Sequence, residues 1–282
     1  MHSDPEPRIE IREVHKAYRV NGQHMQAVAG VSLQAAKGEF VTVIGPSGCG
    51  KSTLFSIICG LQQPDQGEIR FDGAPVLERA GMVGYMPQRD LLMPWRRVLD
   101  NVILGPELQG KSRQAARQEA AELLPLFGLQ GFGESYPSAL SGGMRQRAAL
   151  LRTFLCRKEI MLLDEPFGAL DAITRSNLQQ WLLQVWQQFQ YTVLFVTHDV
   201  EEAVFLSDYV YVFTPRPARV RSGLRISLPR PRTRELTLAP EFLDLKQQLL
   251  AELGVGKVGG QGPTLSSARP NPKRPEHRTR KA

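Results

Sequence analysis

The nine residues from Gly45 to Thr53 have types and spacing that suit a phosphate-binding loop. They fit the pattern G-x-x-x-x-G-K-[ST], in which glycines let successive backbone N–H groups face one anion. Lys51 would reach the β and γ phosphates of a nucleotide, and the Ser52 hydroxyl would bind Mg²⁺. A strand-like apolar run (40–44) comes before the loop and a helix-like run (54–59) follows it, as the motif requires. The predicted phosphate-binding residues are Gly45, Pro46, Ser47, Gly48, Cys49, Gly50, Lys51, Ser52 and Thr53.

Two carboxylates follow a second apolar run, at 160–163, which is typical of a strand buried on both faces. Open α/β sheets bind ligands at the carboxyl ends of their strands, which is where Asp164 and Glu165 would lie. Asp164 is the natural partner of Mg²⁺. Glu165 could polarise an attacking water, a role worth about 10²- to 10⁴-fold in rate. His198 ends a further apolar run and could reach the same γ phosphate, although a lone histidine at a strand end is more often structural.

A second glycine-rich segment occupies residues 140–146. Ser141 is placed to cap a helix, and Gly142 and Gly143 would expose backbone N–H groups at the positive end of that helix. The chain therefore has two phosphate-seeking helix ends about a hundred residues apart. Both could act on one nucleotide within one chain, or two chains could share them. The residues alone leave both arrangements open.

Size and charge limit the classes of protein. The chain has 282 residues and 42% hydrophobic content, its three cysteines lack metal-type spacing, and it has no run of 18 apolar residues. Its first residues lack the pattern of a signal peptide, so we expect a cytosolic chain with reduced thiols. Residues 1–214 hold 20 basic and 23 acidic side chains, whereas residues 215–282 hold 15 and 5. The net charge of +7 thus comes from the C-terminal part, which could meet nucleic acid or an anionic membrane or simply be solvated.

The hydrophobic pattern predicts an α/β domain with a helical insertion. The Asn21-Gly22 turn predicts an antiparallel hairpin, and residues 89–157 have a helical period. Asp171 would cap a long helix, and Asp199 with Glu202 resembles a capping box. Predicted strands are 8–14, 26–33, 68–73, 83–86, 192–197 and 209–213, and further predicted helices are 98–104, 112–126, 142–156 and 240–253.

These motifs, in this order, resemble those of the ATP-binding subunits of ABC transporters. The phosphate loop matches Walker A, Gln88 the Q-loop, and residues 140–146 the family signature. Residues 160–165 match Walker B, residues 167–171 the D-loop and His198 the H-loop. The resemblance covers roughly residues 8–214. It implies a P-loop NTPase (RecA-like) α/β core with an N-terminal antiparallel β subdomain and an inserted α-helical subdomain.

The predicted organisation follows from this resemblance. Residues 1–87 and 158–214 form the nucleotide-binding core with its β subdomain, and residues 88–157 form the helical subdomain. Residues 215–255 form a C-terminal extension, and residues 256–282 a basic, disordered tail.

The resemblance also implies roles within an ATP and Mg²⁺ site. Tyr18 falls at the family's A-loop and would stack on the base. Glu165, His198 and Gln88 would be catalytic, and Ser52, Gln88 and Asp164 would hold the metal. ATP on one subunit would be closed over by Ser141, Gly142 and Gly143 of another copy in a head-to-tail homodimer. Asp171 of the D-loop would also bind the nucleotide. Met144 departs from the glutamine of many members, which removes a side-chain contact but no backbone donor.

Within the family, residues 86–102, 213–217 and 228–232 resemble importer subunits for nitrate, sulfonate and taurine, and relatives for thiamine precursors. The resemblance implies integral membrane permease subunits as partners and, indirectly, an extracytoplasmic solute-binding protein, with this chain peripheral on the cytoplasmic face of the inner membrane. The residues expected to contact the permease are Leu91, Leu92, Met93 and Trp95. The alternative is that these side chains pack into a local core between the two lobes.

Two other classes of function also use a phosphate loop of this kind. A soluble ABC ATPase acting on nucleic acid or ribosomes would use the basic tail, but the single cassette and the lack of a long coiled-coil insertion argue against it. We therefore expect no nucleic acid partner. A P-loop GTPase is disfavoured because the sequence lacks an N-K-x-D guanine reader.

Overall fold

The turn at Asn21-Gly22 folds the start of the chain into the predicted hairpin. In the computed structural model, which describes residues 7–168 and 170–254, β1 (Pro7–Val20) pairs antiparallel with β2 (Gln23–Ala36). Both strands are longer than predicted. With β4 (Gln66–Phe71) and β5 (Ala74–Pro75), they form a four-stranded sheet in the order β2-β1-β4-β5.

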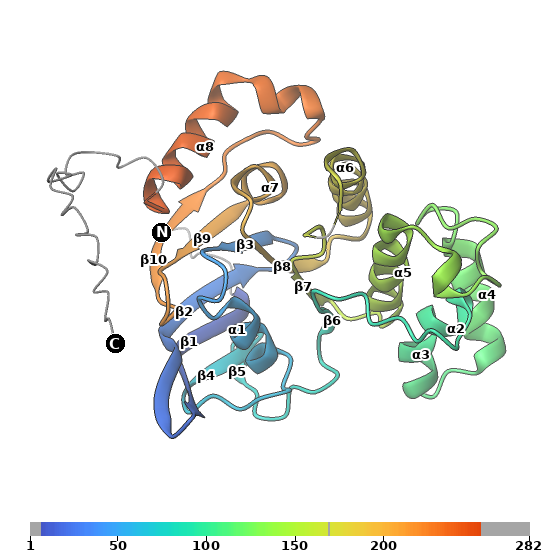
Figure 1. Cartoon of the computed structure of the whole chain (residues 1–282), viewed down its shortest axis with the longest axis horizontal. Helices are drawn as coiled ribbons and strands as arrows, with labels where there is room; N and C mark the ends of the chain where they lie inside the picture. Colours follow the sequence, from blue (N-terminus) through green and yellow to red (C-terminus); the bar gives the residue numbers. More distant parts are fainter. Residues whose placement is uncertain (1–6, 169, 255–282) are drawn as a thin grey trace, which may run out of the picture.

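A second, six-stranded sheet lies at the centre of the molecule (Figure 1). Its order is β10-β9-β3-β8-β7-β6, and all neighbours are parallel except the antiparallel edge strand β10. The strands are β3 (Phe40–Ile44), β6 (Gly84–Met86), β7 (Ile160–Asp164), β8 (Thr192–Thr197), β9 (Tyr209–Phe213) and β10 (Val220–Arg225). The uninterrupted apolar runs of β3, β7 and β8 are fully buried, which confirms the expectation of strands covered on both faces.

The alternating side chains of these strands separate two hydrophobic cores. Val41 and Val43 of β3 pack with α1 (Lys51–Ile58) and the four-stranded sheet. Phe40 and Ile44 face the other core, which includes α6 (Ala172–Phe189) and α7 (Val200–Leu206). The sheet thus holds α1 on one face and α6 and α7 on the opposite face.

The helical part lies to one side of the sheets (Figure 1). It contains α2 (Val98–Val102), α3 (Leu104–Leu108), α4 (Arg113–Leu123), the 3₁₀ turn η1 (Pro137–Ala139) and α5 (Gly142–Leu155). The helix predicted over 98–104 is confirmed as α2, but it ends at Val102 and a new helix begins at Leu104. Pro106 has no N–H and fits only the first turn of a helix, and the start of α3 at Leu104 places it in that turn.

The segment after β9 contributes more structure than the sequence predicts. Strand β10 was missed, whereas the predicted helix near the C-terminus is confirmed as α8 (Pro240–Glu252), preceded by the 3₁₀ turn η2 (Arg234–Leu238). Lys246 of α8 forms an ion pair of 2.9 Å with Glu201 of α7. Residues 256–282, predicted to be a basic tail, lie outside the described residues. Within residues 7–168 and 170–254, no helix combines the length and apolar character that a membrane span needs.

The predicted helix caps at Asp171 and Asp199 have different outcomes. Asp171 caps α6 as expected by accepting a hydrogen bond from the Thr174 N–H at 3.0 Å. Asp199 caps α7, but Glu202 does not return to the Asp199 N–H, so the capping box is wrong in that half. The buried Glu202 carboxylate instead accepts hydrogen bonds from the Thr197 hydroxyl at 2.6 Å and from the Gln179 amide at 2.9 Å.

Candidate functional site

The carboxyl ends of four neighbouring parallel strands meet at one edge of the six-stranded sheet. The phosphate loop (residues 45–53) follows β3, and Gln88 comes shortly after β6. Asp164 ends β7 with Glu165 next, and His198 directly follows β8. Because parallel strands end on the same side, segments far apart in the sequence are gathered there.

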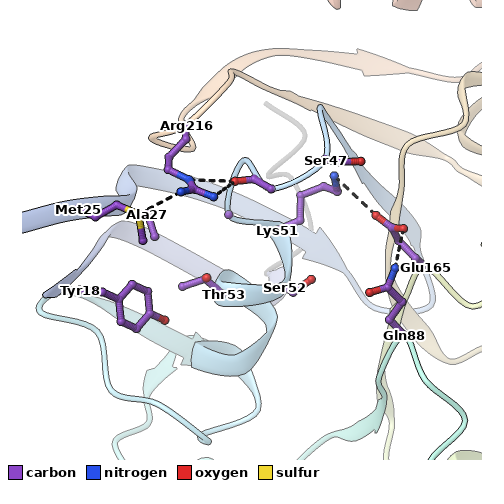
Figure 2. Close-up of a pocket in the computed structure, with 12 residues that line it drawn as sticks. Tyr18, Met25, Ala27, Ser47, Lys51, Ser52, Thr53, Gln88, Glu165 and Arg216 are labelled. Atoms are coloured by element: carbon purple, nitrogen blue, oxygen red, sulfur yellow. Dashed lines mark hydrogen bonds and ion pairs between the residues drawn. The ribbon is translucent and has the colours of Figure 1, made fainter. Parts of the chain in front are cut away.

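A cavity of about 340 Å³ lies between the phosphate loop, the hairpin and the end of β7 (Figure 2). Nine residues predicted for the nucleotide site line it, whereas Gly45, Pro46 and Cys49 of the phosphate loop, Asp164 and His198 do not. The lining residues are Tyr18, Met25, Ala27, Ser47, Gly48, Gly50, Lys51, Ser52, Thr53, Gln88, Glu165 and Arg216.

The phosphate loop is shaped by close contact with neighbouring backbone. Gly50 has φ of 127°, and a Cβ there would lie 2.5 Å from the Ala27 carbonyl oxygen, so only glycine fits. Helix α1 begins at the next residue and directs its free N–H groups toward the cavity. The Lys51 ammonium is 4% exposed and donates to the carbonyls of Gly45 at 2.7 Å and Pro46 at 3.1 Å. The loop thus presents fixed positive charge to an anion.

Glu165 lies at the centre of the predicted catalytic residues. Its Oε2 atom is 3.2 Å from Gln88 Nε2 and 3.2 Å from His198 Nδ1, and its Oε1 atom is 3.8 Å from Lys51 Nζ. Figure 2 shows the contacts of Glu165 with Gln88 and Lys51. The Glu165 N–H donates to the Val196 carbonyl at 3.0 Å, which ties it to β8. The structure therefore brings all three predicted catalytic residues together.

Asp164 fits the predicted metal site. Its carboxylate is 2% exposed, and one oxygen, Oδ1, is buried without a hydrogen-bond partner. Burial raises the pKa of Asp164, the nearby Ser52 hydroxyl opposes that rise and the Glu165 charge adds to it. Within the described part of the chain, no three His, Cys, Asp or Glu side chains gather as a metal site. One carboxylate, one hydroxyl and one amide fit Mg²⁺, which takes its remaining ligands from water and phosphates.

Tyr18 lies on the cavity wall, with its hydroxyl donating to Gln62 Oε1. The hairpin pairs Tyr18 with Met25, which also lines the cavity and was missed by the sequence analysis. The two-residue turn fixes that register, so counting outward from Asn21-Gly22 would have found Met25. Ala27 and Arg216 were also missed. Arg216 lies in the segment 213–217 that resembles importer subunits, but that resemblance gives it no role in the nucleotide site.

The signature segment (residues 140–146) lies outside this cavity. Ser141 caps α5, and its hydroxyl oxygen accepts a hydrogen bond from the Met144 N–H at 3.2 Å. Gly142 and Gly143 form the first turn of the same helix. Asp171 caps α6 and is likewise absent from the cavity lining. Within one chain, the two predicted phosphate-binding helix ends are therefore separate.

The predicted permease-contact residues divide into exposed and buried side chains. Leu91 is 58% exposed and Trp95 is 74% exposed. Leu92 is only 8% exposed and packs within the core that includes α2 and α5, so its assignment to the contact surface is wrong. Met93 is half-buried, and its backbone is bound on both sides by Asn101. Two exposed side chains, Leu91 and Trp95, remain for a surface contact.

A phosphate loop at the end of a central parallel strand, facing a carboxylate pair of which Asp164 is buried, defines a P-loop nucleoside triphosphatase. The family model described as ABC transporter matches residues 28–168. The aliphatic sulfonates import ATP-binding protein SsuB of Bacillus cereus is 38% identical over 248 residues, covering 88% of this chain and 96% of that protein. The taurine import ATP-binding protein TauB of Pseudomonas aeruginosa is 40% identical over 250 residues, covering 87% and 95%.

The dimeric structure of the bacterial ABC transporter cassette MJ0796 matches with a TM-score of 0.69 and 30% identity, covering 78% of this chain and all of that one. These likenesses confirm the fold and the resemblance predicted from the motifs. This chain belongs to the ABC transporter family, as an ATP-binding subunit with ATPase activity.

Proposed function

We propose that this chain is the ATPase of an importer for a small solute of the nitrate, sulfonate or taurine type. The names of the similar import proteins support the solute class. The observation that carries the catalytic part is the position of Glu165, held between Lys51, Gln88 and His198 at one end of the nucleotide cavity. A carboxylate there can accept a proton from a water that attacks the γ phosphate.

The residues around the cavity divide the binding of the base, the phosphates and the metal among them. Tyr18 offers an aromatic face to the base, and Lys51 with the loop N–H groups binds the phosphates. Ser52, Gln88 and Asp164 hold Mg²⁺, which when bound neutralises charge on the phosphate oxygens. His198 Nδ1 contacts the Glu165 Oε2 atom and so orients this general base. The other ring nitrogen of His198 can then contact the γ phosphate.

The complete ATP site requires two copies of the chain. Ser141, Gly142 and Gly143 lie outside the cavity of their own chain, although the start of α5 has the N–H groups that bind an anion. A head-to-tail homodimer would bring this helix end over the phosphates bound by the other copy, with Asp171 alongside. The dimeric form of the similar cassette supports this arrangement.

The chain acts at the cytoplasmic face of the inner membrane as a peripheral subunit. Leu91 and Trp95, close after Gln88, are the apolar side chains available to a helix of the permease. Arg152 holds this segment by donating to the Leu91 carbonyl at 2.8 Å and to the Asp90 carbonyl. Movement of Gln88 during ATP binding would therefore reach the permease through a short, hydrogen-bonded segment. An extracytoplasmic solute-binding protein would deliver the solute.

Mixing two inactive variants tests the shared site. Lys51→Ala removes the phosphate contact, and Ser141→Arg blocks the signature segment, so each homodimer should be inactive. A heterodimer of the two has one intact composite site and should recover phosphate release. The matched control mixes Lys51→Ala with the Lys51→Ala/Ser141→Arg double variant, which leaves no intact site. Absence of recovery in proven heterodimers would contradict a shared site.

A further inference from the structure

Arg216 lines the nucleotide cavity although it belongs to the turn after β9, beyond the residues matched by the family model. Its guanidinium donates two hydrogen bonds to the Gly48 carbonyl of the phosphate loop, from Nε at 3.0 Å and from Nη2 at 2.7 Å. Nη1 lies 3.0 Å from the Met25 sulfur. Figure 2 shows the guanidinium between Met25 and the phosphate loop.

The turn that carries Arg216 is fixed to the hairpin. The Ala218 N–H donates to the Ala27 carbonyl at 2.9 Å, and the Ala29 N–H donates to the Ala218 carbonyl at 2.9 Å. The Thr214 hydroxyl closes the turn by donating to the Pro217 carbonyl at 3.0 Å. Arg216 therefore extends from a fixed backbone, so holding its guanidinium costs side-chain entropy but little further backbone entropy.

The forked contact fixes the orientation of one peptide unit in the phosphate loop. A trans peptide is planar, so its C=O and its N–H point in opposite directions. Holding the Gly48 oxygen on the guanidinium therefore holds the whole Gly48-Cys49 peptide plane. The same guanidinium brings a permanent positive charge to the edge of a cavity that receives phosphates. Lysine could replace the charge but not the planar fork.

We propose that Arg216 is a positioning residue that holds the phosphate loop in its anion-binding conformation and so strengthens binding of nucleotide diphosphates and triphosphates. This inference rests on the ATP site proposed above. Because the loop surrounds the β and γ phosphates, the effect of Arg216 increases with the length of the phosphate chain. Arg216 does not take part in bond breaking, so it alters nucleotide affinity more than turnover at saturation.

The test measures binding of ATP, ADP and AMP to the full chain and its Arg216→Ala and Arg216→Lys variants. We expect Arg216→Ala to weaken ATP and ADP binding about tenfold, equivalent to about 1.4 kcal/mol. AMP binding should change less than about twofold, since the dipole-rich loop acts on the outer phosphates. KM for ATP should rise about tenfold while kcat stays within about threefold, and Arg216→Lys should restore only part of the affinity.

Arg219→Ala is the matched control. It removes the same charge from the same turn, but Arg219 is exposed and does not line the cavity, so ADP binding should stay within about twofold of wild type. Wild-type ADP affinity in Arg216→Ala would overturn the inference, as would an equal loss in Arg219→Ala or an equal loss for AMP and ADP. If Arg216→Ala does not fold, judged by its melting without nucleotide, the inference is tested on the ADP affinity of Arg216→Lys. An affinity equal to that of wild type would then overturn the inference. Failure of wild type to bind any nucleotide would instead refute the ATP site itself.

Discussion

Replacing Glu165 with glutamine removes the charge of the proposed base while preserving its shape. The amide can keep the positions of the carboxylate oxygens, which lie 3.2 Å from Gln88 and from His198. It cannot accept a proton from water at neutral pH. We therefore expect Glu165→Gln to bind ATP and to hydrolyse it very slowly.

The size of the loss follows from the role of a positioned base. General base catalysis contributes about 10²- to 10⁴-fold, or about 2.7 to 5.4 kcal/mol of barrier. Binding should change in the opposite direction, because Glu165 attracts Lys51 across 3.8 Å. That attraction is about 1 kcal/mol at the dielectric constant of water and about 4 kcal/mol at an effective value of 20. Its removal leaves Lys51 free for phosphate, so ATP affinity should be unchanged or higher.

The assay compares phosphate release at saturating ATP with equilibrium ATP binding. Glu159→Gln is the matched control, since Glu159 precedes the other end of β7 and its side chain is 62% exposed. We expect that control to retain turnover within about twofold. Turnover of Glu165→Gln within about fivefold of wild type, with the protein folded, would refute the base assignment.

Two further predictions concern the buried carboxyl group of Glu202 and the exposed side chain of Trp95. Burial raises the pKa of Glu202 above its ordinary 4.5. The stability that the protonated Glu202 side chain contributes is therefore fully present below pH 4.5 and is lost as the pH rises through the pKa of the folded state. Glu202→Gln should thus raise Tm at pH 7 by a few degrees, at about 2–4 °C per kcal/mol, and this rise in Tm should disappear near pH 4. A rise in Tm that is the same at both pH values would contradict burial of the charged carboxylate as its cause. Trp95→Ala should leave ATPase activity of the isolated chain unchanged but reduce transport at least about tenfold in the assembled importer, because exposed aromatic anchors dominate interfaces. Leu108→Ala, 80% exposed on α3, is its control, and normal transport by Trp95→Ala would exclude that contact.

The central part of the fold is predictable because its signals are local. Buried parallel strands have uninterrupted apolar runs, and the hairpin has a two-residue turn that sets its register. Strand β10 lacks such a signal because it is an edge strand with alternating half-buried and exposed residues and includes Gly223. The break between α2 and α3 depends on one proline within an otherwise helical pattern. Periodicity alone therefore extended the first of these helices too far.

The nucleotide site shows the same division between local and distant signals. The phosphate loop and the Asp164-Glu165 pair are contiguous motifs at strand ends, so the sequence reveals them. The burial of Leu92 depends on packing against helices of the inserted part, which a run of adjacent apolar residues does not specify. Arg216 reaches a loop that lies 168 residues earlier, because a backbone pairing between its turn and β2 sets its position. No pattern of neighbouring residues contains that information.

The phosphate loop owes its shape to residues that lie outside the segment matched by the family model. The Ala27 carbonyl limits Gly50, and a Cβ on Gly45 would lie 2.9 Å from the Phe213 Cβ. The guanidinium of Arg216 holds the Gly48 carbonyl from a third direction. The motif supplies the N–H donors, but their orientation depends on the hairpin and on the end of β9. Two chains with the same loop sequence can therefore differ in nucleotide affinity, because the contacts that hold the loop are free to vary independently of the motif.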